Sequence, residues 1–327
     1  SSSALVAAAS ISSYALADVS VTGAFEWRYT TQSSSQAAED GTEFGTDNEV
    51  TITFTNKTDT GLTLTGVYDF DADGAGDFSG GDESHLTIAG GFGSVSLGLN
   101  DAANDSFGIG EHDLIDEDLT GTPGSSSIVT NAGESGNSDA NKLSYITPAM
   151  GGFKAGYSIA DSGTATQSTD QTAMGASYTM PISGGSLMIR YNKQSTDGTA
   201  SAETESSNYG AKLTMGAASI IVAHGESTIG MGTNQSDDRS ADGVSVKYSL
   251  GGGISVAAST LSAEDDKDIA AGINEKYTAN LAEVVYSIAP GLSAKVTYLD
   301  YDYKRGGETL STNDSGSKTQ LTVSASF

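Results

Sequence analysis

Carboxylates are the side chains of this sequence that are best placed to do chemistry. The stretch 100–141 carries nine of them and contains no lysine or arginine. They are Asp101, Asp105, Glu111, Asp113, Asp116, Glu117, Asp118, Glu134 and Asp139. Burying such a set away from water would be costly, whereas in a wet space it creates a potential that attracts cations. We therefore expect this stretch to be solvated and to act on cations.

A second acidic segment, residues 71–83, has the hard oxygen donors that calcium and magnesium prefer. Its carboxylates alternate with small residues and glycines, and the donors in question are Asp71, Asp73, Asp77 and Asp82. This spacing suits Ca²⁺ or Mg²⁺, although the glutamate at the twelfth position of an EF-hand is missing. Two interpretations stay open, a Ca²⁺ site and an acidic loop that is simply solvated. No cofactor is required by the sequence.

Catalysis and nucleic-acid binding have little support. The chain has no cysteine and only three histidines, His85, His112 and His224, and it lacks Gly-x-Ser-x-Gly and His-Glu-x-x-His. We predict that it is not an enzyme. With 42 acidic against 15 basic residues, the formal net charge is −27, which repels phosphate backbones. We therefore expect no nucleic-acid partner.

The elements that must position these groups are predicted to be β-strands. From Asp18 onward, and again up to Phe327, apolar residues alternate with polar ones, as in a strand with one apolar and one polar face. The polar face carries basic side chains, Arg28, Arg190, Lys212 and Lys295. No stretch of 18 apolar residues exists, which excludes a transmembrane helix. A β-barrel remains compatible, because its strands alternate in the same way.

Turns and loops of unequal length punctuate these strands. Seven tight turns are centred near residues 58, 91, 150, 183, 216, 252 and 290. Eight longer acidic loops alternate with them, near 31–47, 71–82, 100–141, 160–170, 193–207, 225–241, 260–276 and 302–317. Sixteen strands, short turns at one end, longer loops at the other and two aromatic bands are typical of an outer-membrane barrel. A soluble β-sandwich or β-solenoid explains the alternation but not the asymmetry.

The first seventeen residues differ from the rest. Ser1–Ala17 is weakly apolar, carries no charge and ends in Ala15-Leu16-Ala17, which has the form of a secretory cleavage site. We expect residues 1–17 to be the remainder of a signal peptide and residues 18–327 to form the barrel. A disordered arm of small residues is the alternative.

Four stretches carry a resemblance to a known family. They are Thr58–Leu62, Gly90–Val95, Asn141–Pro148 and the terminal Val323–Phe327. In this order, with the long third loop, the chain from Asp18 to Phe327 resembles the general diffusion porins of Gram-negative outer membranes, particularly the alphaproteobacterial type. The Pro-Glu-Phe-Gly-Gly signature of enterobacterial third loops is absent, and only Ser106–Gly110 lies near that place.

The resemblance implies an all-β fold, a 16-stranded antiparallel transmembrane β-barrel with a long third loop folded into the pore. It also implies a homotrimer in the outer membrane of a Gram-negative bacterium, and contacts with the lipid bilayer. External carboxylates would be bridged by divalent cations to lipopolysaccharide. The terminal Phe327 would serve barrel assembly.

Function follows from where the charges would lie. Acids of the third loop would face the basic wall residues Arg28, Arg190, Lys212 and Lys295, which would create a transverse field in the narrowest section. We expect passive diffusion of small hydrophilic solutes and ions, with cation selectivity. A loop that merely faces water outside the cell, and local salt bridges at each basic residue, are the alternatives for these sites. A solute-specific channel or a surface receptor barrel is the alternative function.

Overall fold

The computed structural model describes residues 17–35, 40–71, 81–115, 140–160, 171–196, 203–231, 235–266, 274–306 and 313–327. All strands in these ranges belong to one closed sheet in which every neighbour is antiparallel. No helix in the same ranges is long and apolar enough to cross a membrane. The segment 1–16, in which a signal peptide is expected, lies outside the described residues.

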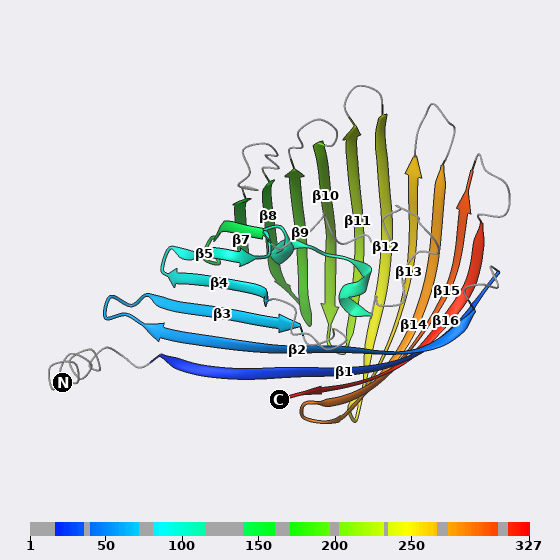
Figure 1. The fold of residues 1–327 in the computed structure, drawn as a ribbon, viewed down its shortest axis with the longest axis horizontal. Helices are drawn as coiled ribbons and strands as arrows, with labels where there is room; N and C mark the ends of the chain where they lie inside the picture. Colours follow the sequence, from blue (N-terminus) through cyan, green and yellow to red (C-terminus); the bar gives the residue numbers. More distant parts are fainter. Residues whose placement is uncertain are drawn as a thin grey trace, which may run out of the picture.

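Sixteen strands form the barrel, in chain order around the wall (Figure 1). Their bounds are β1 Asp18–Ser34, β2 Gly41–Lys57, β3 Thr63–Asp71, β4 Gly81–Gly90, β5 Gly93–Asn100, β6 Ala140–Ile146, β7 Phe153–Ala160 and β8 Gln171–Ile182. They continue with β9 Gly185–Thr196, β10 Glu203–Met215, β11 Ala218–Met231, β12 Gln235–Gly251, β13 Ile254–Asp266, β14 Glu275–Ala289, β15 Leu292–Arg305 and β16 Asp314–Ser326. The predicted strand number is confirmed.

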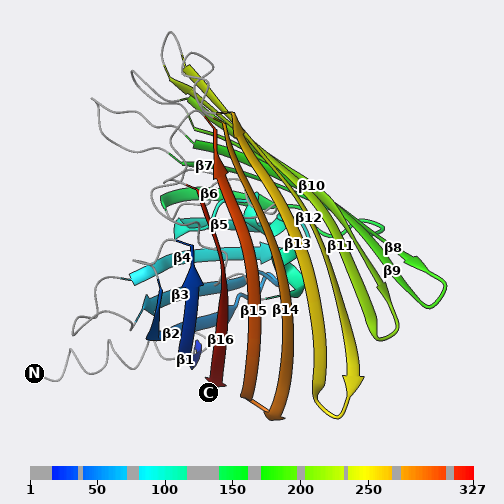
Figure 2. The same ribbon diagram turned by 90° about the vertical axis from the view of Figure 1, so that its right-hand side faces the viewer.

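The first and last strands close the barrel. β1 pairs with β16 from Ala24 opposite Ser326 to Ser34 opposite Gly316, and Figure 2 shows the two strands side by side. Beyond β16, the Phe327 amide donates to the Gly23 carbonyl at 2.9 Å. Closure leaves no sheet edge unpaired, which is the condition for a sheet to stand in lipid.

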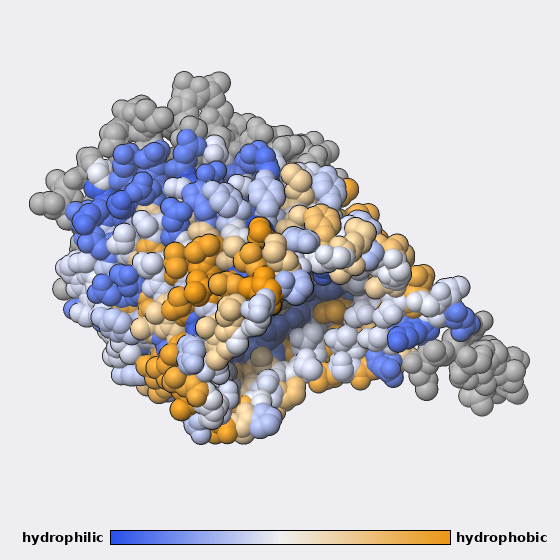
Figure 3. Space-filling view, turned by 180° about the vertical axis from the view of Figure 1, so that it is seen from behind, coloured by the Kyte–Doolittle hydropathy of each residue, from blue (hydrophilic) through white to orange (hydrophobic). Residues whose placement is uncertain are grey.

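The outer wall is apolar where it is expected to meet lipid. Large apolar side chains on alternate positions are exposed, including Tyr191, Tyr209 and Tyr298 toward the long loops and Tyr178 and Tyr248 toward the short turns. Figure 3 shows hydrophobic side chains gathered across the wall, with hydrophilic ones above them. The two aromatic bands expected from the sequence therefore lie on the outer face.

The seven short turns lie where the sequence predicts them, but the strands extend further into the predicted loops. β11 reaches Met231 and β12 begins at Gln235, within the predicted loop 225–241. Likewise β1 reaches Ser34 and β2 begins at Gly41, within the predicted loop 31–47. These strand ends carry mostly polar residues on both faces, so the regular alternation of apolar and polar residues is lost although the hydrogen-bonded ladder continues.

Candidate functional site

The first part of the third loop lies against the inner wall. Two short 3-10 helices follow β5, η2 Asp105–Phe107 and η3 Glu111–Leu114. η2 contacts β8 and β9, and η3 contacts β11, β12 and β13. The segment therefore runs along the inner wall from β8 to β13, as Figure 1 shows. Residues 116–139 of the predicted pore loop, among them Asp116, Glu117 and Asp118, lie outside the described residues.

Apolar side chains of this segment pack on the wall. Ile109, Leu114 and Ile115 are at most 5% exposed and join one buried cluster with wall residues such as Ile221 and Leu261. The sequence predicts a short helical turn over His112–Leu119, with Leu114, Ile115 and Leu119 packing on the wall. The observed turn is η3, which ends at Leu114, and Leu119 lies outside the described residues.

Polar wall residues bind the backbone of the segment. Asn208 on β10 accepts a hydrogen bond from the Ile109 amide at 3.0 Å and donates one to the Ile109 carbonyl at 2.9 Å. Arg190 on β9 donates to the Gly108 carbonyl at 2.5 Å. Arg190, which was expected to face the acidic loop across the bore, therefore holds the loop itself.

The four predicted loop acids in the described ranges differ in their surroundings. Glu111 is 2% exposed and faces the wall at Gly243. Asp113 accepts a hydrogen bond from the Gly110 amide at 3.2 Å, which caps η3, yet its side chain is exposed. Asp105 is exposed and Asp101 half-buried. Asp105 and Asp113 are therefore the ones most accessible to solutes.

The other predicted basic residues face the interior from β1, β10 and β15. Arg28 donates from Nε to Glu26 at 2.5 Å and from Nη2 to Asp47 at 2.6 Å, so two carboxylates balance its charge. Lys295 lies within electrostatic range of Glu26. Lys212 lies between Met188 and Ile221 on the neighbouring strands. Arg28 thus forms the local salt bridges that were the alternative for these residues.

An acidic wall on β2 and β3 was missed by sequence reasoning. It consists of Glu43, Asp47, Glu49, Asp69 and Asp71. Glu49 lies opposite Asp71 and Thr51 lies opposite Asp69 in the register, which places these side chains on one face. They alternate with outward residues such as Phe44, which is 72% exposed. Because residues 31–47 were assigned to a loop, the inward side of β2 was not recognised.

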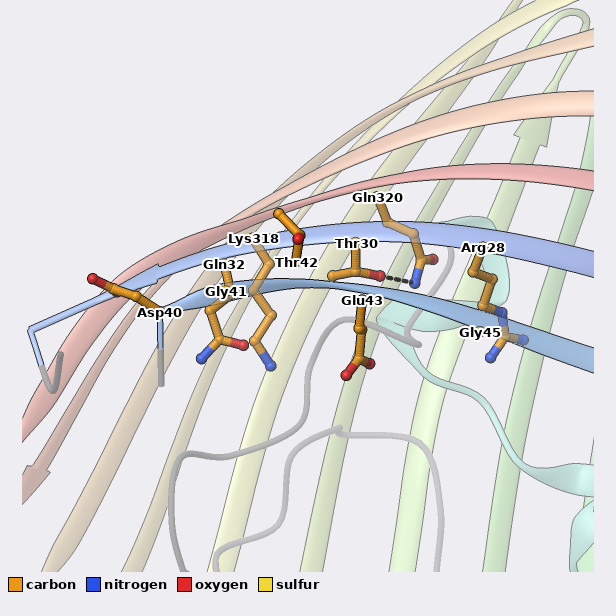
Figure 4. Close-up of a pocket in the computed structure, with 10 residues that line it drawn as sticks. All are labelled: Arg28, Thr30, Gln32, Asp40, Gly41, Thr42, Glu43, Gly45, Lys318 and Gln320. Atoms are coloured by element: carbon orange, nitrogen blue, oxygen red, sulfur yellow. Dashed lines mark hydrogen bonds between the residues drawn. The ribbon is translucent and has the colours of Figure 1, made fainter. Parts of the chain in front are cut away.

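A polar recess lies beside this wall, at the junction of β16, β1 and β2. It has a volume of about 410 Å³, and Gly41 and Gly45 contribute no side chains to fill it. Figure 4 shows Arg28, Glu43 and Lys318 pointing to the same side of the strands, into the barrel. Gln320 donates to Thr30 at 3.1 Å along its floor. The recess therefore offers both charge signs and hydrogen-bonding groups to a solute.

The inner wall also carries aromatic residues that sequence reasoning missed. Tyr277, Tyr301 and Tyr303 on β14 and β15 are at most 4% exposed and belong to the inner buried cluster. The two predicted aromatic bands did not include these tyrosines, and of the three only Tyr303 falls in a predicted loop, 302–317. Alternation counted from the exposed Tyr298 would have placed Tyr301 and Tyr303 inside.

The predicted calcium ligands are only partly described. Asp71 ends β3 as part of the acidic wall. Asp73 and Asp77 lie outside the described residues, and so does the side chain of Asp82. Within the described ranges, no group of three or more histidine, aspartate or glutamate side chains is arranged to hold a metal ion.

The barrel is similar to solved outer-membrane proteins of low sequence identity. OmpT of Vibrio cholerae in its trimer form is 13% identical with a TM-score of 0.72, over 96% of this chain and 100% of that one. The anion-selective porin from Comamonas acidovorans is 16% identical with a TM-score of 0.70, over 95% and 100%. A mutant of the Rh. blastica porin is 15% identical with a TM-score of 0.63, over 95% and 100%. These likenesses show the fold.

The family itself is shown by the sequence. No curated protein matches this chain. The family model for Gram-negative porins, however, matches residues 2–327, nearly the whole length. The resemblance carried by the turns, the third-loop region and the terminal phenylalanine is thereby confirmed, and an outer-membrane location follows from the family. The chain belongs to the Gram-negative porin family.

Proposed function

We propose that this chain forms a water-filled channel for passive diffusion of small hydrophilic solutes and ions, with a preference for cations, and that it catalyses no reaction. The observation that carries the proposal is the closed barrel with a charged, polar inner face beside an unfilled recess. A polar lumen lets hydrated solutes pass, whereas an apolar one would dewet.

The preference for cations is supported by the acidic wall. Between Gly41 and Gly90, the strands β2, β3 and β4 carry one basic residue other than histidine, Lys57, which lies at the turn end. Two of the predicted wall bases, Arg28 and Arg190, are engaged by carboxylates and by the loop backbone. An excess of carboxylates along one side of a pore attracts cations.

A planar-bilayer recording tests the proposal. We expect ohmic current that grows linearly with solute concentration, and a reversal potential of cation-selective sign in a KCl gradient. The fold alone does not predict this sign, because a similar barrel belongs to an anion-selective porin. An anion-selective reversal potential would contradict the proposed preference for cations. Folded protein without conductance would contradict the proposed channel function.

A solute-specific channel or receptor barrel is the alternative. The recess at Arg28, Glu43 and Lys318 favours it, because charges of both signs beside hydrogen-bonding side chains can recognise one class of solute. Current that saturates, or block by one solute class at micromolar concentration, would favour this alternative over general diffusion.

We further propose a homotrimer whose outer surface contacts lipopolysaccharide. The similar barrel of Vibrio cholerae OmpT has a trimer form, which supports self-association. Carboxylates also face outward above the aromatic band, for example Glu205 and Glu264, each paired with a lysine. Ca²⁺ could bridge such carboxylates to lipid phosphates. Native mass measurement tests the trimer, and loss of bound lipopolysaccharide on chelation tests the bridge.

A further inference from the structure

The inner wall lacks side chains where the third-loop segment rests on it. Three inward-facing glycines mark the place, Gly156 on β7, Gly175 on β8 and Gly243 on β12, which we call the glycine seat. A Cβ added at Gly175 would lie 2.5 Å from the Phe107 ring, and one at Gly243 would overlap the Glu111 carboxylate. Phe107 is 1% exposed, so its ring is fully packed against the glycine seat.

The strands themselves do not require these glycines. The left-handed φ values of this chain occur at other glycines, such as Gly61 and Gly152, and not at the seat. The three nearest atoms to an added Cβ belong to Phe107 alone at Gly175, and to Glu111 alone at Gly243. At Gly45, another inward glycine, the nearest atom would be the Arg28 Cβ at 3.8 Å. The absence of side chains at the glycine seat therefore makes room for the third-loop segment and not for the strands.

Hydrogen bonds keep the segment in register on the seat. Between Phe107 and Glu111, the Ile109 amide and carbonyl both bond to the side chain of Asn208. Further along, the Ala103 amide donates to Ser158 on β7 at 2.9 Å. A segment anchored at several points on a close-packed wall can move away from the wall only toward the bore, because the wall leaves no room behind it.

We propose that the glycine seat is a specificity-determining element that keeps the channel wide by letting the third-loop segment lie flat against the wall. The inference rests on the proposed channel function. A side chain larger than hydrogen at Gly175 or Gly243 would lift Phe107 or Glu111 toward the bore and narrow it. Seat glycines thus set the free cross-section without touching a solute.

A rescue experiment tests this role in the full-length protein. Gly175→Ala is expected to lower single-channel conductance and to slow the entry of larger sugars in liposome swelling. Phe107→Gly in the same background removes both the clashing ring and the Phe107 Cβ, which lies 2.6 Å from the added Cβ, so conductance should return toward the parent value. Gly66→Ala on β3 adds the same methyl group to the barrel wall away from the segment, where the nearest atom would be the Phe54 Cβ at 3.9 Å, and should leave conductance nearly unchanged.

A cross-link tests the placement of the segment independently of conduction. The chain contains no cysteine, so an introduced pair has no competing partner. The Cβ of Glu111 lies 3.0 Å from an added Cβ at Gly243, which is shorter than the separation of about 3.5–4.5 Å in disulfides, so a small shift of the segment toward the bore brings the pair into range. Glu111→Cys with Gly243→Cys should oxidise to a reducible cross-link in the folded barrel, and Glu111→Cys with Gly45→Cys should not.

The outcomes separate this inference from the channel proposal. A folded parent that does not conduct would remove the channel function, while the cross-link would still report on the seat. A conducting parent with unchanged conductance in Gly175→Ala, or without rescue by Phe107→Gly, would overturn the role of the seat. Absence of the Glu111–Gly243 cross-link in heat-modifiable, folded protein would overturn it as well.

Discussion

At the scale of single residues, one carboxylate supports the seam, the pairing of β1 with β16 that closes the barrel. Asp314 begins β16 and is 3% exposed. It accepts hydrogen bonds from Ser34 Oγ at 2.6 Å, Ser35 Oγ at 2.9 Å and Tyr301 Oη at 2.7 Å. These bonds join β15 and β16 to β1, the strands farthest apart in the sequence. A buried charge with three donors is stable only while those donors remain in place.

We predict that Asp314→Ala lowers the free energy of unfolding by roughly 2–4 kcal/mol, because three hydroxyl groups lose their acceptor in a buried place. The temperature at which the barrel unfolds in detergent gels should fall accordingly. Asp314→Asn retains one acceptor oxygen and should lose less. Equal heat resistance of parent and Asp314→Ala would show that the seam does not depend on these bonds.

At the scale of elements, the turn between β6 and β7 shows why some glycines cannot be replaced. Gly152 has φ 93°, and an added Cβ would overlap the Thr179 carbonyl of β8. The Gly152 carbonyl also accepts a hydrogen bond from the Thr179 amide at 2.9 Å. Its neighbour Gly151 has φ 60° but nothing within 4 Å. Gly152 is therefore restricted both by the neighbouring strand and by its left-handed backbone, whereas Gly151 is restricted by its backbone alone.

We predict that Gly152→Ala destabilises the barrel by about 3 kcal/mol or more, since the turn must leave β8 to relieve the clash. Gly151→Ala should cost only about 1–2 kcal/mol, the penalty of a left-handed backbone. Urea unfolding in detergent followed by tryptophan fluorescence measures both. Equal losses in the two variants would contradict the packing argument.

The sequence predicts these turns well and the upper strand ends poorly, for a physical reason. Glycine and proline specify the turn conformation locally, so the short turns lie where they are expected. Above the apolar band, strands such as β2 carry mostly polar residues on both faces, and no regular hydrophobic alternation marks their length. The acidic wall lies on such a strand end. The contact of Phe107 with Gly175 joins segments that are far apart in the sequence, so no local sequence pattern predicts it.

At the scale of the whole molecule, the position of each charge counts for more than the net charge of −27. The acidic wall lies on β2 and β3, whereas the predicted bases Arg190, Lys212 and Lys295 lie on β9, β10 and β15. Outward acids such as Glu205 and Glu264 are separated from the bore by the wall itself. Charges on the inner face should therefore govern permeation, and charges on the outer face should not.

The same geometry predicts how selectivity depends on salt. The Debye length falls from about 10 Å at 0.1 M to about 3 Å at 1 M, so the field of the acidic wall reaches less of the bore at high salt. We expect the cation preference, read from reversal potentials in KCl gradients, to weaken steadily over this range. A preference independent of salt would indicate a tight binding site in place of a diffuse field.

Neutralising the acidic wall should reduce the preference at low salt more than neutralising any outward set of charges. The test variant combines Glu43→Gln, Asp47→Asn and Asp69→Asn, and the control combines Glu205→Gln with Glu264→Gln. Loss of Asp47 also removes one of the two carboxylates that balance Arg28, so the reversal potential should shift toward anions beyond what the lost charges alone would cause. Asp113→Asn, on the exposed side of η3, should shift it less, because the wall retains its carboxylates. An unchanged reversal potential in the wall variant would place the selective charges elsewhere along the channel.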